Sequence, residues 1–277
     1  MNIIRDNKLT EKNINDIEAL TQACSEVDGD NLLVYADEGD NIYPKFDCFY
    51  MMYDEDPKVS EDAKLLGFLS VFQPDGYCPY VYAMVDPKYR KQGIFKKLYD
   101  DFMDEFKYFK FESVSFPTNK DNETAINILK KMEGYKYSTE YILGLDIDSS
   151  DSNTKSETPD KLTLTSSYND DGTITYFLND LALGHFKRTI GSLIITKDDG
   201  IACLSHFEIQ KSKRNKGYGR TMLDMLCKDL HENNVNKIIL QVTSNNPAAL
   251  HLYTSYGFKI QSELDYYNID YNVNTIN

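Results

Sequence analysis

Hydrophobic residues in the first half of the chain follow helical spacing and strand spacing in turn. Apolar residues recur every three or four positions after Thr10 and again after Gly93, which predicts two amphipathic helices. Thr10 is suited to cap the first of them. The expected elements of this half are a helix after Thr10, strands at 48–53, 64–72 and 80–85 in an antiparallel meander, a helix after Gly93, a strand at 113–116, a helix at 122–132 and a closing strand or hairpin at 136–147.

The pattern of the second half predicts strands first and then a similar ending. Residues 148–160 are polar and Ser-rich and contain no hydrophobic residue, so we interpret them as a linker between domains at 1–147 and 161–277. The expected elements are strands at 162–166, 173–178, 181–190, 192–196 and 201–209, a helix to about Leu230, a strand at 237–242, a helix at 247–256 and strands at 259–263 and 266–271. The part before the glycine turn is 36 residues shorter than in the first half, so no counterpart of the first helix is expected.

Four landmarks recur along the chain at nearly the same spacing. Arg90 and Arg214 are 124 positions apart, and so are Gly93 and Gly217. The other two are Asn122-Glu-Thr-Ala125 with Asn246-Pro-Ala-Ala249, again 124 apart, and Gly134-Tyr135 with Gly257-Phe258, 123 apart. A repeat of this length indicates the duplication of a whole domain rather than a solenoid.

The repeated glycines lie where a strand pattern changes to a helix pattern. His206–Arg220 begins like the end of a strand, contains two glycines one residue apart and continues with helical spacing. Glycines let the backbone approach a ligand closely, and the free N–H groups at a helix start attract an anion. Both turns are basic although the chain carries a formal net charge of -14. The basic residues are Lys211, Lys213, Arg214, Lys216 and Arg220 in the second half and Lys88, Arg90, Lys91, Lys96 and Lys97 in the first. This combination suggests a polyphosphate ligand.

These segments resemble the two signatures of the GNAT acyltransferase superfamily. Arg214-Asn215-Lys216-Gly217-Tyr218-Gly219 is similar to its (Arg/Gln)-x-x-Gly-x-(Gly/Ala) motif, and Asn246-x-x-Ala249-x-x-x-Tyr253-x-x-x-Gly257-Phe258 is similar to its second motif. The resemblance implies an α/β (α+β) fold with two tandem GNAT-type domains, each a mixed, mainly antiparallel sheet flanked by helices. The two-domain arrangement resembles that of mycothiol synthase.

The resemblance also implies acetyl-CoA as the cofactor and indicates the residues that hold it. In the family, amides of the turn bind the pyrophosphate, and the preceding strand pairs with the pantetheine arm. In the second half these positions are Phe207, Ile209, Arg214, Asn215, Lys216, Gly217, Tyr218, Gly219, Arg220 and Asn246. In the first half they are Val85, Arg90, Lys91, Gln92, Gly93, Ile94 and Phe95. Asn246 could equally cap the helix that Pro247 opens.

Acyl transfer to an amine needs a base that deprotonates the ammonium group and an acid that protonates the departing thiolate. Tyr253 matches the family's tyrosine acid, although a tyrosine on an amphipathic helix could also be a core residue. His206 and Glu208 are the candidate bases, with a water relay as the alternative. Their parity places them on one face of the strand unless a bulge intervenes.

The first half departs from the family pattern at two positions. Phe95 stands where Gly or Ala is usual, and Leu129, 124 positions before Tyr253, cannot donate a proton. We therefore expect catalysis in the second half, whereas cofactor binding in the first half stays open. The alternative function is a non-catalytic pair that binds acyl-CoA as a sensor or interaction module.

Composition limits the partners further. The acidic net charge of -14 argues against nucleic acid and suits a cationic small molecule. Five widely spaced cysteines without a Cys-x-x-Cys pair indicate neither a disulfide framework nor a metal site. No apolar run could span a membrane and the chain does not open like a secretory signal, so a cytoplasmic protein is expected. The expected acceptor is an amine of a small molecule or peptide, and the oligomeric state stays open.

Overall fold

The chain folds into two compact units. The computed structural model describes residues 2–29, 34, 36, 41–109, 111–147, 161–182 and 186–271. Unit 1 comprises Met1–Ser138 and Leu264–Asn277, and unit 2 comprises Thr139–Glu263. The expected linker at 148–160 lies outside the described residues.

Unit 1 is built on a mixed sheet with the strand order β1-β2-β3-β4-β5-β12. Neighbouring strands are antiparallel except β4 and β5, which run parallel. Its strands are β1 (Asn2–Asp6), β2 (Phe49–Tyr53), β3 (Leu65–Phe72), β4 (Tyr80–Val85), β5 (Ser113–Asn119) and β12 (Lys259–Asp270), and its helices are α1 (Glu11–Asp28), η1 (Pro87–Tyr89), α2 (Ile94–Phe106) and α3 (Glu123–Lys131).

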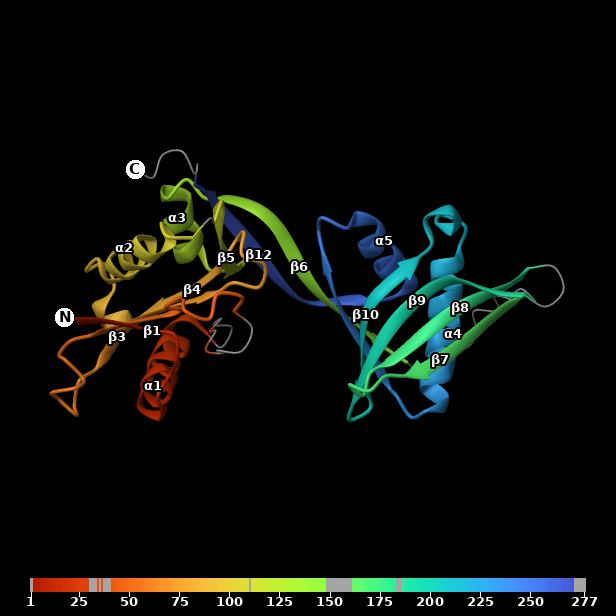
Figure 1. The fold of residues 1–277 in the computed structure, drawn as a ribbon, viewed down its shortest axis with the longest axis horizontal. Coiled ribbons are helices and arrows are strands. Elements are labelled where there is room, and N and C mark those ends of the chain that lie inside the picture. Colours follow the sequence, from red (N-terminus) through yellow and green to blue (C-terminus); the bar gives the residue numbers. More distant parts are fainter. Residues whose placement is uncertain are drawn as a thin grey trace. The chain divides into compact units, whose positions relative to one another are not determined.

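Helices α1 and α2 cover opposite faces of the unit 1 sheet (Figure 1). Thr10 caps α1 through a capping box, as its sequence predicted. Gly67 on β3 lies under α2, where a Cβ would come within 2.6 Å of Ile94. Met84, whose side chain points to the other face, accepts a weak hydrogen bond from Thr21 of α1. A glycine at position 67 therefore allows α2 to pack closely on the strands that lead to its own start.

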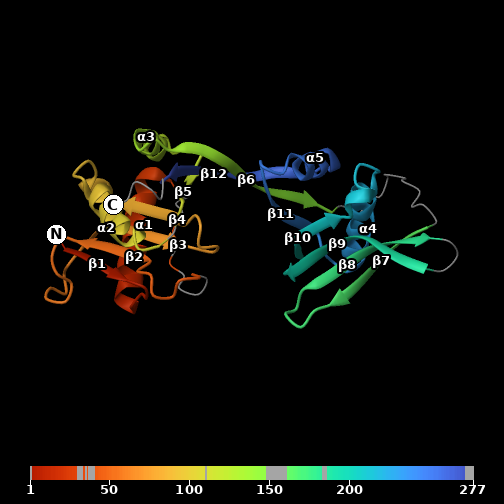
Figure 2. The same ribbon diagram turned by 45° about the horizontal axis from the view of Figure 1, so that its top comes forward.

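Unit 2 is built on a mixed sheet with the strand order β6-β11-β10-β9-β8-β7, in which β10 and β11 run parallel. Its strands are β6 (Tyr135–Asp146), β7 (Leu162–Tyr168), β8 (Ile174–Ala182), β9 (Phe186–Asp198), β10 (Ile201–Ile209) and β11 (Lys237–Thr243), and its helices are η3 (Lys211–Lys213), α4 (Tyr218–Glu232) and α5 (Pro247–Tyr256). Helix α4 packs its buried leucines on this sheet (Figure 2). Ahead of β10, the described residues of unit 2 form strands and turns and no helix.

The last strand of each sequence half closes the sheet of the other unit. Strands β6 and β12 are equivalent in the repeat, because their first residues, Tyr135 and Lys259, are 124 positions apart. Residues 140–146 of β6 pair with β11, and residues 264–270 of β12 pair with β5. The compact units therefore differ from sequential domains at 1–147 and 161–277, since each closing strand has residues in both units.

Three expected breaks between strands are absent from the described residues. Strand β8 runs from 174 to 182, through the break expected at 179–180. Residues 186–198 form the single strand β9, through the break expected before 192. Strand β12 runs from 259 to 270, through the break expected at 264–265. Gly191, which lies at the break expected before 192, is a packing position: a Cβ there would come within 2.5 Å of the Ile209 side chain. The polar run in β12 continues as a strand because Leu264 and Asp265 pair with β5.

Two further findings concern the described residues as a whole. None of their helices is long and apolar enough to cross a membrane. They contain no group of three or more His, Cys, Asp or Glu side chains arranged to hold a metal ion, and the five cysteines are free thiols.

We expect the protein to lose stability at alkaline pH because of its buried tyrosines. Burial raises the pKa of Tyr253 to about 12 and raises the pKa of Tyr50 and Tyr99 as well. A tyrosine of the unfolded chain titrates near pH 10, so the unfolded state loses protons first. The free energy of unfolding should be unaffected by these groups below about pH 9. It should then fall by about 1.4 kcal/mol per pH unit for each such tyrosine between about pH 10 and 12.

Urea unfolding at a series of pH values between 8 and 11 measures this loss. Tyr50→Phe should reduce the slope, because the Tyr50 hydroxyl is buried without a hydrogen-bond partner. The matched change Tyr77→Phe, at a side chain that is 67% exposed, should leave it unchanged. Equal stability at pH 8 and pH 11 would contradict the expectation.

Candidate functional site

In unit 2 the parallel strands β10 and β11 separate a few residues before the glycine turn. Strand β10 pairs with β11 from Ile201 to Leu204, and this pairing does not continue through the described residues beyond Leu204. The register of β10 against β9 shifts between Ser205 and Glu208, and His206 has a φ of 51°. This is a β-bulge, so His206 and Glu208 do not simply share one face of a regular strand. Both side chains are exposed.

The turn after β10 presents a row of backbone N–H groups. Asn215 and Gly217 have φ values of 59° and 81°, a left-handed pair that makes a concave turn. Gly217 is the N-cap of α4, and no side chain caps this helix. The Thr221 N–H donates to the Gly217 carbonyl at 3.0 Å, so the helical amides before Thr221 have no acceptor inside the helix. The arrangement suits a phosphate group at the start of α4.

Unit 1 repeats this turn closely. Lys91 and Gly93 have φ values of 62° and 79°, and α2 starts at Gly93 without a side-chain cap. The Lys97 N–H donates to the Gly93 carbonyl at 3.0 Å, as in unit 2. The signature arginine also makes the same contact twice: Nε of Arg90 donates to the Val85 carbonyl, and its counterpart in unit 2 donates to the equivalent carbonyl. The arginine therefore fixes the end of the strand to the turn.

Four of the five basic side chains around the unit 2 turn, those of Lys213, Arg214, Lys216 and Arg220, have partners in the protein. Nζ of Lys213 lies 3.0 Å from an Asp180 oxygen, and the Arg220 guanidinium lies 5.3 Å from the Tyr256 ring centroid and donates to a carbonyl of α5. Lys216 donates to a carbonyl of η3. The backbone amides, rather than these side chains, are thus the groups of the turn best placed to bind an anion.

Asn246 occupies the capping position that its sequence allowed. Its Oδ1 accepts from the Ala249 N–H at 3.2 Å at the start of α5. Asn122 makes the same bond to the Ala125 N–H at 3.0 Å in α3. The capping role is confirmed, while a contact between Asn246 and the cofactor stays a prediction.

Tyr253 lies on α5, inside unit 2 and next to the bulged strand. Its side chain is only 6% exposed, with ring centroids of Phe207 at 6.2 Å and Phe258 at 5.5 Å. Within the described residues its hydroxyl has no hydrogen-bond partner. Burial raises its pKa to about 12, so the phenol keeps its proton at neutral pH. Phe207 links it to the turn, because the ring tip lies 4.0 Å from where a Cβ of Gly219 would be.

The two candidate bases have different surroundings. Glu208 accepts from Arg214 at 3.1 Å, so this carboxylate is held in an ion pair. Nδ1 of His206 lies 3.2 Å from the Ser205 hydroxyl. Its other ring nitrogen has no partner in the part of the chain that the structure describes, which leaves it available for a proton.

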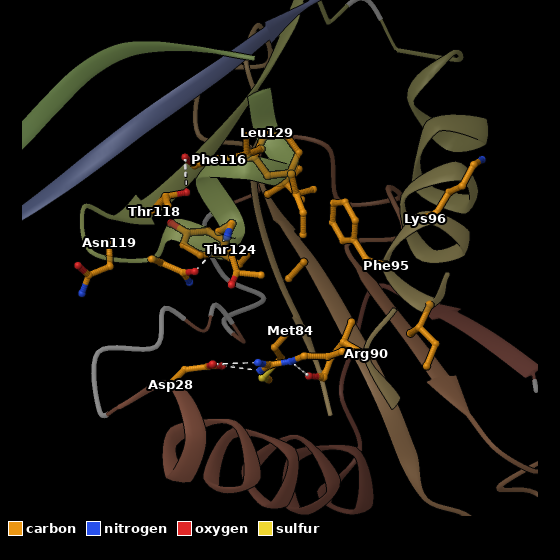
Figure 3. Close-up of a pocket in the computed structure, with 18 of the residues that line it drawn as sticks. Asp28, Met84, Arg90, Phe95, Lys96, Phe116, Thr118, Asn119, Thr124 and Leu129 are labelled. Atoms are coloured by element: carbon orange, nitrogen blue, oxygen red, sulfur yellow. Dashed lines mark hydrogen bonds and ion pairs between the residues drawn. The ribbon is translucent and has the colours of Figure 1, made fainter. Parts of the chain in front are cut away.

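An open pocket of about 490 Å³ lies in unit 1, at the place equivalent to the unit 2 site (Figure 3). It is lined by β4, the basic turn, the end of β5 and α3. Phe95 points into it from α2, with Leu129 and Phe116 nearby and the ion pair of Arg90 with Asp28 farther along (Figure 3). The unit 2 counterpart of Phe95 is Gly219, where a Cβ would meet Leu252 at 3.1 Å. Position 95 thus carries a large side chain where unit 2 has close packing on a glycine.

Sequence reasoning missed one wall of this pocket. Phe116, Pro117, Thr118 and Asn119 at the end of β5 line it, as do Thr124, Ala125 and Ile128 of α3. Thr124 and Ala125 belong to the repeated Asn122-Glu-Thr-Ala125 segment, but no motif marks the others. The only available signal was their position, because they follow the repeated strand and the repeated asparagine cap.

Both units therefore define a class of α/β acyltransferase fold, with parallel strands that separate beside an uncapped helix. The chain belongs to the acetyltransferase (GNAT) family, whose model matches residues 16–135 and 145–258. The two matches establish tandem domains, and acetyl transfer is the general reaction of such folds. No curated protein matches the sequence significantly.

Solved structures with the same fold cover nearly the whole chain. A GCN5-related N-acetyltransferase from Sphaerobacter thermophilus has a TM-score of 0.68 and 12% identity, and the match covers 97% of this chain and 95% of that one. A tandem GNAT protein from the clavulanic acid biosynthesis pathway has a TM-score of 0.61 and 12% identity, with 97% and 98% covered. A GCN5-related N-acetyltransferase from Anabaena variabilis has a TM-score of 0.56 and 11% identity, with 98% and 74% covered. At such low identity these likenesses concern the fold.

Proposed function

We propose that the protein transfers an acetyl group from acetyl-CoA to an amine, and that unit 2 carries out the chemistry. The observation that carries this proposal is the position of Tyr253, a buried, protonated phenol whose hydroxyl has no partner among the described residues. It lies beside a turn that is built to bind phosphate. Leu129 occupies the equivalent place in unit 1 and has no proton to donate.

The residues of unit 2 fit coenzyme A. The amides from Asn215 to Arg220 would hold the pyrophosphate, since the left-handed turn directs them outward and α4 has no cap of its own. Phe207 and Ile209 lie on the stretch of β10 that has left β11, so their backbone is placed to pair with the pantetheine arm. When bound, acetyl-CoA supplies the activated acyl group.

The protein would then move two protons. A base takes one from the ammonium group, because an amine with a pKa near 10.4 is mostly protonated at neutral pH. We assign this role to His206, whose second ring nitrogen is unoccupied, ahead of Glu208, which is held by Arg214. The Tyr253 phenol gives the other proton to the departing thiolate.

The acceptor class follows from the family reaction and from charge. We propose an amine of a small molecule or of a peptide, which carries a positive charge in solution and is attracted by a chain with a net charge of -14. Nucleic acid would be repelled by the same charge. We expect the protein to act in the cytoplasm.

Thiol release from acetyl-CoA in the presence of a panel of amines tests this function. We expect at least one amine to give release well above the rate of hydrolysis without amine. His206→Gln should lower kcat by about 10², whereas Glu208→Gln should change kcat by less than about tenfold. The reverse order would move the base to Glu208.

A non-catalytic acyl-CoA-binding module is the second candidate function. The open pocket in unit 1, where Leu129 stands at the position equivalent to Tyr253, favours it for that unit. Such a module would bind coenzyme A but would release no thiol with any amine. Tyr253→Phe would then leave its affinity for coenzyme A unchanged.

A further inference from the structure

The pocket of unit 1 borders on the last strand of the chain. Four consecutive β5 residues line it, and each has its pairing partner on β12. The pairs are Phe116 with Tyr267, Pro117 with Tyr266, Thr118 with Asp265, and Asn119 with Leu264. The opposite wall is β4, which pairs with β5 only at Tyr80 and Ser115. A ligand that binds between β4 and β5 therefore contacts β5, whose pairing in the sheet is mainly with β12.

The other end of β12 supports the helix that carries Tyr253. Residues Lys259–Glu263 of β12 belong to unit 2, and only Gly257 and Phe258 separate the strand from α5. The N–H groups of both linking residues lie 3.1 Å from the Tyr253 carbonyl. The Phe258 ring packs on the Tyr253 ring at 5.5 Å. A displacement or ordering of β12 thus reaches the backbone and the ring of the proposed acid directly.

We propose that unit 1 is a regulatory site for a coenzyme A thioester and that β12 couples its occupancy to the unit 2 site. This inference rests on the proposed function of unit 2. Unit 1 keeps the left-handed turn, the uncapped helix and an open pocket, whereas Leu129 replaces the acid. A thioester that binds there is retained and not consumed, because Leu129, at the position equivalent to Tyr253, has no proton to give to its thiolate.

The expected sign of the coupling is positive. A ligand in the pocket contacts β5 and so restricts the motion of β5 and of β12, which pairs with it and continues to the segment that supports Tyr253. The entropic cost of this restriction is then met once for two binding events, so the second event is more favourable. Because coupling is reciprocal, each site should raise the affinity of the other by the same factor.

Calorimetric titration of the full chain with coenzyme A tests the proposal. We expect two molecules per chain and positive cooperativity. Gly93→Ala and Gly217→Ala form a matched pair, since both positions have φ near 80° and a Cβ at either meets no protein atom within 4 Å. The added methyl group would stand in the space where a phosphate approaches. Each variant should bind one molecule, with an affinity lower by about fivefold or more than that of the same site in the cooperative wild type.

An insertion of two glycines between Glu263 and Leu264 separates coupling from binding. It interrupts β12 at the boundary between the units and leaves both sites intact, so two molecules should bind without cooperativity. If Gly93→Ala does not fold, Ala125→Phe, which fills the pocket from α3, replaces it.

The outcomes are distinguishable. One molecule bound by the wild-type chain, or two sites that are independent in the wild type, would overturn the regulatory site while the unit 2 reaction could still stand. Two cooperative sites without turnover of any amine would contradict the proposed reaction and still support the coupling.

Discussion

Tyr253→Phe should lower kcat by about 10² or more while the protein stays folded. The substitution removes only the hydroxyl, and the ring keeps its contacts with Phe207 and Phe258. A general acid contributes about 10²–10⁴ to rate. KM for acetyl-CoA should change little, because the turn amides and β10 are untouched. Steady-state kinetics with the best amine of the panel measures both constants.

Two controls make the Tyr253 prediction specific. Tyr256→Phe removes a hydroxyl from the same helix, where it bonds to the Cys227 thiol, and it should leave kcat within about twofold. An acyl donor with a more acidic leaving thiol needs less help from an acid, so it should restore much of the rate of the Tyr253→Phe variant. Wild-type turnover by that variant would place the acid elsewhere.

The features of the site that depend on residues close in the sequence were predictable. The glycines at positions 93 and 217 indicated a turn before a helix, and both have positive φ at such a turn. The asparagine at 246 was expected to cap a helix, and it does. The burial of Tyr253 fitted the apolar spacing of α5 as well as its proposed role, so the pattern alone did not separate the two.

Features that depend on distant partners were not predictable. Strands β6 and β12 have equivalent positions in the repeat, and either could pair with β5 or β11, since the pattern of a strand fixes its faces but not its neighbour. The bulge at His206 depends on the register against β9. The unit 1 pocket depends on where the Phe95 ring lies between two helices, although the sequence showed only that a glycine was missing.

A chain that ends after Glu263 should lose the fold of unit 1. Residues 264–270 supply all the pairing between β12 and β5, and without them β4 is the strand with which the described residues of β5 still pair. Tyr267 and Ile269 are 8% and 6% exposed and belong to the unit 1 core. Loss of each such side chain costs about 2–5 kcal/mol, and a domain has only about 5–15 kcal/mol of stability.

Urea unfolding, followed by circular dichroism and by near-ultraviolet signals of the tyrosines, measures the loss. A chain that ends at Tyr271 is the matched control, because it keeps every described contact of β12, including the 2.5 Å hydrogen bond between the Tyr271 and Tyr99 hydroxyls. The shorter chain still contains all of unit 2, Thr139–Glu263, so one unfolding transition should remain. Two unfolding transitions with the same midpoints as in the control would mean that unit 1 folds without residues 264–270 of β12. The coupling between β5 and Tyr253 would then have no structural path, because β12 is the element that joins them.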